Sequence, residues 1–255
     1  MSCAIVFDRS PSMITLAFRS TLFAAALSLA ACEEGGPSLV PDAQVEAMGL
    51  QEWQQIRANV PASRNAADQQ RLTRVTRRLL AAAGESTGDW EWQVFENPQP
   101  NAFALPGKRI GVFSGMMRIA ETDAQLATVV AHEIGHLQAN HGSERVSAQA
   151  ASQIGLQVLD AALGAGEIAG RDQIGAALGM GVEYGVLLPY SRRNELEADR
   201  LGIELMADAG YDPRAALEFW QAMKRASGNR GPEFLATHPA PDNRIAQIEE
   251  IIAAQ

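Results

Sequence analysis

Two histidines and a glutamate lie close together in the HExxH segment, His132-Glu133-Ile134-Gly135-His136, and these residue types can bind and use a metal ion. On an α-helix, positions i and i+4 lie on one face about one turn apart, so the two imidazoles can reach the same ion. Glu133 sits roughly 100° further round such a helix than His132, where it can contact a water on the metal without binding the metal itself. This spacing is typical of a zinc hydrolase with a glutamate base.

The residues before the HExxH segment indicate the helix that must carry it. Thr122 and Gln125 have the spacing of a capping box, which marks a helix start. Leu126, Val129 and Ile134 continue an apolar repeat of helical period into the segment. We therefore expect one helix that begins near Thr122 and presents both histidines on one face.

A catalytic zinc usually takes three protein ligands and keeps a fourth position for water, so a third ligand must lie elsewhere. His141 would be roughly 140° away from His136 on a continuous helix, and we interpret it as a surface histidine at the helix end. Glu195 and Asp199 share a face by the i, i+4 rule, whereas Glu197 points elsewhere. We expect Glu195 to be the third ligand and Asp199 to orient a ligating histidine through its other N–H. Taken alone, these acidic residues also suit a solvated charged face.

Four motifs follow one another along the chain: NAFALPG at 101–107, HEIGH at 132–136, NELEAD at 194–199, and THP at 237–239 followed by DNRI at 242–245. Their order resembles the HtpX and CAAX prenyl endopeptidase family of membrane-associated zinc peptidases, which includes the periplasmic proteases BepA and LoiP. The resemblance runs from about residue 42 to the C-terminus. It implies a gluzincin with an α+β, mostly helical, zincin-like domain and one Zn²⁺ ion per chain.

Two further residues, His238 and Arg244, lie in the last of these motifs. The resemblance places a cation or N–H donor near the metal there, where it would stabilise an oxyanion. For either residue, a capping or surface role remains an alternative. A neutral imidazole at His238 also has the right chemistry to be a displaceable fourth metal ligand that inhibits the enzyme. Lys108 stands where the family commonly has a second glycine, and a type II turn with positive φ only at Gly107 should tolerate it.

The N-terminus has the pattern of a secretory signal, with Arg19 before the short apolar run Leu22–Ala31. Cys32 follows in a sequence that looks like a bacterial lipobox, although an ordinary signal peptide or anchor with a chance cysteine is the alternative. We expect residues 1–31 to be a lipoprotein signal peptide, 32–41 a tether and 42–255 the metallopeptidase domain. Lipidated Cys32 would hold the protein at the periplasmic face of the outer membrane.

Composition and charge narrow the class of protein. With 47% hydrophobic and 20% charged residues in 255, one well-cored domain is expected. A formal charge of −9 argues against nucleic acid as a partner. Patterns predict helices at 42–59, 64–83 and 241–253, a further helix after Asp212, strands at 89–95 and 108–113, and a turn-rich connection at 97–106. We expect the strands to form one small antiparallel sheet beside the zinc helix. The resemblance implies that strand 108–113 borders the cleft, where an exposed edge could hold an extended peptide by backbone pairing.

The sequence therefore predicts a lipid-anchored periplasmic zinc metalloendopeptidase that cleaves unfolded or misassembled envelope proteins. The alternative is a chaperone or assembly factor for outer-membrane proteins in which proteolysis is secondary. An intact Glu133 favours the enzyme, because a pure binding protein has no need of a base next to the metal.

Overall fold

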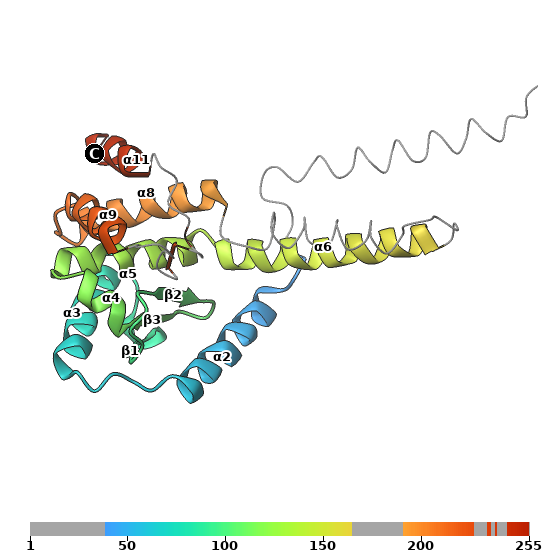
Figure 1. Cartoon of the computed structure of the whole chain (residues 1–255), viewed down its shortest axis with the longest axis horizontal. Coiled ribbons are helices and arrows are strands. Elements are labelled where there is room, and N and C mark those ends of the chain that lie inside the picture. The colour runs from blue at the N-terminus through green and yellow to red at the C-terminus, as the bar shows by residue number, and fades with distance from the viewer. Residues whose placement is uncertain (1–38, 165–190, 227–233, 236–237, 239–243, 255) are drawn as a thin grey trace, which may run out of the picture. The chain divides into compact units, whose positions relative to one another are not determined.

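The computed structural model describes residues 39–164, 191–226, 234–235, 238 and 244–254 (Figure 1). The signal segment, Cys32 and most of the predicted tether lie outside the described residues. The predicted boundaries at residues 31 and 41 and the lipidation of Cys32 therefore stay predictions.

The described part of the chain is mostly helical with one small sheet, which confirms the predicted α+β class. The helices are α2 (Asp42–Asn59), α3 (Ala66–Ala82), the 3-10 turn η2 (Thr87–Asp89), α4 (Ser114–Ile119), α5 (Asp123–Gln138), α6 (His141–Gly164), α8 (Arg192–Asp208), α9 (Ala215–Ala226) and α11 (Arg244–Ala253). The strands are β1 (Glu91–Phe95), β2 (Ala102–Leu105) and β3 (Arg109–Phe113). Among the described helices, none is both long and apolar enough to cross a membrane.

The sheet is mixed, with the order β1-β3-β2. β2 and β3 form an antiparallel hairpin in which Phe103 lies opposite Gly111, while β1 pairs parallel to β3 with Val94 opposite Val112. The prediction of a purely antiparallel sheet was therefore wrong. The error comes from the segment 97–106, for which the sequence predicts a turn-rich connection but which contains β2. Because β2 pairs with β3, the latter is the central strand, and the edges of the sheet that could pair with a peptide belong to β1 and β2 rather than to 108–113.

The hairpin turn between β2 and β3 places two consecutive residues in the left-handed region, Gly107 at φ 82° and Lys108 at φ 64°. The expectation that only Gly107 would need positive φ was wrong. A left-handed lysine costs roughly 1–2 kcal/mol, which explains the preference for glycine at this position. The Lys108 ammonium partly offsets that cost, because it lies 2.6 Å from a carboxylate oxygen of Glu85 and over the ring of Trp90.

Helix α5 begins with the predicted capping box, in which the Thr122 side chain accepts from Gln125 N–H and the Gln125 side chain accepts from Thr122 N–H. It packs most extensively against α8, and Figure 1 shows the two helices side by side. Glycines make this approach close, since a Cβ at Gly202 would lie 2.9 Å from His132 N, and one at Gly135 would lie 3.0 Å from Ala198 O. The HExxH face of α5 and the acidic face of α8 are thereby held together.

Candidate metal centre

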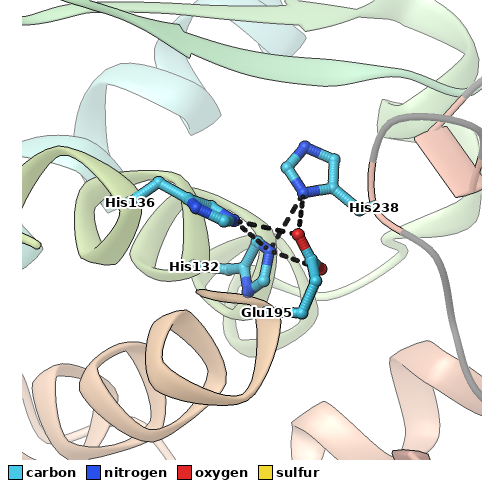
Figure 2. Close-up of side chains that lie close together, drawn as sticks. All are labelled: His132, His136, Glu195 and His238. Carbon is cyan, nitrogen blue, oxygen red and sulfur yellow. Dashed lines mark hydrogen bonds and ion pairs between the residues drawn. The ribbon is translucent and has the colours of Figure 1, made fainter. Parts of the chain in front are cut away.

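Four buried side chains from three parts of the chain meet at one point (Figure 2). His132 and His136 come from α5, Glu195 from the first turn of α8, and His238 from the segment before α11. One potential ligand atom from each lies within 4.8 Å of the others. His132 Nε2 and His136 Nε2 are 3.0 Å apart, and Glu195 Oε1 lies 3.3 Å from His136 Nε2.

The chemistry of this cluster fits a metal ion. Lone pairs on two imidazole nitrogens that face each other at 3.0 Å repel unless a proton or a cation lies between them. Two imidazoles and a carboxylate are a common ligand set for a catalytic divalent metal. The structure thus brings together His132, His136 and Glu195, the three residues predicted as ligands, and adds His238 beside them.

The ionisable groups of the cluster hold opposite charges. Burial disfavours the charged form of His132, but hydrogen bonds to Asp199 and Glu195 outweigh it and raise the pKa of His132 to about 9. Burial lowers the pKa of His136 to about 3. Burial opposes ionisation of Glu195 as well, yet hydrogen bonds from the surrounding histidines keep its pKa well below the usual range. The surroundings thus favour the charged form of His132 and the neutral form of His136.

Glu133 lies next to the cluster without belonging to it. Its side chain is 2% exposed, and its Oε1 is 3.4 Å from His238 Nε2. Burial raises the pKa of Glu133, against the lowering effects of His238 and His132 and of a hydrogen bond from the backbone of Ala104 on β2. A carboxylate with a raised pKa beside a metal site suits proton transfer.

Behind the ligands, Asp199 and Arg244 form a second layer of contacts. Asp199 Oδ1 lies 3.0 Å from His132 Nδ1, which is the position predicted for a residue that orients a histidine. Arg244, also buried, donates to both oxygens of Asp199 and, through Nη1, to Glu195 Oε2 at 2.9 Å. Its guanidinium lies 3.9 Å from the centre of the Trp220 ring. Because Arg244 is buried, the surface role that the sequence left open for it is wrong; its guanidinium bonds to the predicted ligand Glu195 and to Asp199 behind it.

The interpretation of His141 as a surface histidine was wrong. Its ring is 2% exposed, and its Nδ1 lies 2.9 Å from His136 Nδ1. The helix does not continue through this region, because α5 ends at Gln138 and Asn140 has φ 55° before α6 begins. An asparagine just past a helix is the sequence signal that was missed, since Asn is the non-glycine residue that most readily adopts this conformation. Glu197 is directed away from the cluster, as expected, and reaches His141 Nε2 at 3.4 Å.

Comparison with known proteins identifies similar chains. The model of the family described as Peptidase family M48 matches residues 66–252. The mitochondrial metalloendopeptidase OMA1 of Schizosaccharomyces pombe is 37% identical over 181 residues, which are 70% of this chain and 51% of that protein. The Beta-barrel assembly-enhancing protease of Yersinia pestis is 32% identical over 209 residues, 80% of this chain and 43% of that protein. Its counterpart in Escherichia coli K12 is 30% identical over 205 residues, 78% of this chain and 42% of that protein. The chain spans about half the length, or less, of these curated relatives.

Proposed function

The chain belongs to peptidase family M48 and carries its metallopeptidase domain, and we propose on this premise that it is a zinc-dependent metalloendopeptidase. The observation that carries the proposal is the meeting of His132, His136 and Glu195 at one point with Glu133 buried next to them. Three such ligands leave a position open for water, which is the arrangement of catalytic rather than structural zinc sites. Asp199 would hold His132 in its ligating tautomer.

Peptide-bond hydrolysis at this site would use the metal ion and the carboxylate of Glu133. When bound, zinc supplies a Lewis acid that lowers the pKa of water and polarises a carbonyl. Glu133 takes a proton from the water as the water oxygen attacks the carbonyl carbon of the peptide. The same carboxyl group then gives the proton to the departing nitrogen as the C–N bond breaks. Its burial favours the first transfer, because a raised pKa makes the Glu133 carboxylate a stronger base and lets it hold the proton between the two steps.

The sheet suggests how a polypeptide enters the site. The backbone carbonyl of Asn101 accepts a hydrogen bond from Phe113 N–H. In the alternating antiparallel ladder, the backbone N–H and C=O groups of Phe103 and Leu105 therefore point toward β3, while those of Ala104 point away from it. Ala104 is also the β2 residue whose backbone reaches Glu133. An extended peptide that pairs with this edge of β2 would therefore run past the proposed base. At the opposite edge, β1 is partly covered by the Gln69 side chain, which bonds both backbone groups of Val94.

His238 is proposed as an inhibitory fourth ligand. Its Nδ1 lies 3.0 Å from Glu195 Oε1 and 3.3 Å from His132 Nε2, in the place of a ligand atom. An imidazole there would compete with water for the metal. The alternative is a catalytic donor that stabilises the oxyanion. The other ring nitrogen of His238, Nε2, lies 3.4 Å from Glu133 Oε1, and this contact does not distinguish the two roles.

The cellular setting is also part of the proposal. The lipobox-like sequence at Cys32 and the likeness to two bacterial proteins named for β-barrel assembly support a periplasmic lipoprotein that degrades unfolded or misassembled envelope proteins. The OMA1 relatives are mitochondrial by name, so the compartment rests on the N-terminal sequence rather than on the family. The words "assembly-enhancing" in the bacterial names favour one second candidate, an assembly factor with proteolysis as a secondary activity.

A direct test is incubation of the purified full chain with unfolded casein, with and without a zinc chelator, followed by mass spectrometry. The proposal predicts internal cleavages that the chelator abolishes and that added zinc restores. Intact casein in the zinc-loaded sample, with binding retained, would support the assembly factor instead.

A further inference from the structure

The second metal-binding histidine is connected to the protein surface through another histidine. His136 Nδ1 lies 2.9 Å from His141 Nδ1, and His141 Nε2 lies 3.4 Å from an oxygen of Glu197. The two rings meet edge to face, with centroids 5.0 Å apart and an angle of 70°. His141 is buried, whereas the Glu197 side chain is 44% exposed. The three residues form a row that starts at the metal cluster and ends in solvent.

The protons in this row can be placed from the chemistry of imidazole. A ligating Nε2 of His136 must present a lone pair to the metal, so the ring proton of His136 lies on Nδ1. At 2.9 Å, two ring nitrogens form a hydrogen bond only when one donates and the other accepts. His141 Nδ1 must then be the acceptor, and the proton of neutral His141 lies on Nε2. That N–H points to Glu197, which accepts it.

The chain brings His141 to this position by interrupting the helix. Asn140 adopts φ 55°, its N–H bonds to Leu137 O, and its own carbonyl accepts from Glu144 N–H in the first turn of α6. The left-handed residue turns the chain so that His141 faces His136, which a continuous helix would not allow. The two metal histidines are thus supported in different ways: His132 by the carboxylate of Asp199, and His136 by an imidazole.

We propose that His141 is a positioning residue that fixes the tautomer and ring orientation of His136 for the metal, and that Glu197 in turn orients His141. The inference rests on the proposed function, because it requires His136 to be a zinc ligand. Partners of this kind outside the ligand shell change metal affinity by about 10–100-fold when they are removed. The effect is therefore measurable by metal binding alone, without a peptide substrate.

Two substitutions of similar polarity separate the roles of the two ring nitrogens of His141. His141→Asn places an amide oxygen at the same bond distance from the backbone as Nδ1 and so keeps an acceptor for His136. His141→Gln places its amide one bond further out, near Nε2, and loses that acceptor. We expect a zinc dissociation constant close to wild type for His141→Asn and one raised about 10–100-fold for His141→Gln. Both are measured on the folded full chain by competition with a chromophoric chelator, and the visible spectrum of the Co²⁺-loaded protein reports the ligand geometry independently.

Ser147→Ala is the matched control, because Ser147 is buried on the same helix but contacts Leu39 N–H rather than the metal cluster. Equal zinc dissociation constants and Co²⁺ spectra in the Asn and Gln variants would overturn the inference. So would a difference in affinity that merely follows a difference in the melting temperatures of the metal-free proteins, since His141 would then act through packing. A wild-type chain that binds no zinc would overturn the proposed function itself.

Discussion

Arg244 on α11 donates two hydrogen bonds to the carboxylate of Asp199 on α8, from Nε to Oδ2 at 2.8 Å and from Nη2 to Oδ1 at 2.7 Å. The same Oδ1 lies 3.0 Å from His132 Nδ1. Nη1 of the guanidinium bonds to Glu195, so one guanidinium contacts two buried carboxylates. The C-terminal helix thereby contributes directly to the order of the metal centre, although it supplies no predicted ligand.

Removal of this cation is expected to destabilise the protein. Arg244→Met would remove the guanidinium that bonds to both Asp199 and Glu195, and the loss of one partner from a buried ion pair typically costs about 3–5 kcal/mol of unfolding free energy. Denaturant unfolding of the metal-free protein measures it. Arg200→Met is the control, since Arg200 pairs with Glu204 on the exposed face of α8 and such a pair contributes at most about 1 kcal/mol. If Arg244→Met kept its stability and zinc affinity and lost only kcat, Arg244 would be an oxyanion donor instead.

The choice of third ligand is tested by two glutamates on one helix. Glu195→Ala should lower zinc occupancy sharply, because Glu195 lies within the cluster. Glu197→Ala should retain zinc, with only the smaller loss of affinity that follows from its contact with His141. Metal analysis of the two purified variants gives the answer. Equal losses would show that the ligand has been wrongly assigned.

The role of His238 is decided by the sign of one effect. As a displaceable ligand it would inhibit, so His238→Ala should raise the basal cleavage of unfolded casein. As an oxyanion donor it would assist, and the same substitution should lower kcat by about 10²–10³. Both rates must be compared at full zinc occupancy, because His238 also contacts Glu195 and His132. A clear fall in kcat would reject the inhibitory role.

The lipid anchor is tested by fractionation. Cys32→Ala should move the protein from the membrane fraction to the soluble fraction, since an acylated cysteine is the anchor that the sequence offers. Cys3→Ala is the control, because Cys3 would be removed with the signal peptide. If the Cys32 variant still sediments with membranes, another segment or a partner holds the protein there.

Local patterns predicted the helix of the metal centre well. The capping box at Thr122, the apolar repeat of α5 and the i, i+4 pairs all depend on neighbours within one or two turns, and the structure has each of them. The Gly202 contact with His132 joins residues 70 apart, so no local pattern reveals that α8 can approach so closely. This close approach of the two helices lets Glu195 and Asp199 on α8 reach His132 on α5.

The sequence-based predictions were wrong where one backbone conformation, or a pairing between distant segments, decided the position of the residues that follow. The left-handed Asn140 turned His141 toward His136, although a continuous helix would have carried it away. In the sheet, the four residues of β2 were too few to show a period of two, and whether β1 is parallel or antiparallel to its neighbour depends on which strand of the hairpin it pairs with. Pairings of this kind are set by distant parts of the chain.

Glu133 is proposed to act on water at a metal held by other residues, and the substitution Glu133→Gln separates this role from metal binding. Glutamine preserves shape but cannot accept the proton, so the variant should bind one zinc per chain and lose about 10²–10⁴ in kcat on casein. Glu121→Gln, an exposed change just before α5, should behave as wild type in both measurements. Loss of zinc from Glu133→Gln, or cleavage near the wild-type rate with zinc bound, would show that Glu133 is not the base.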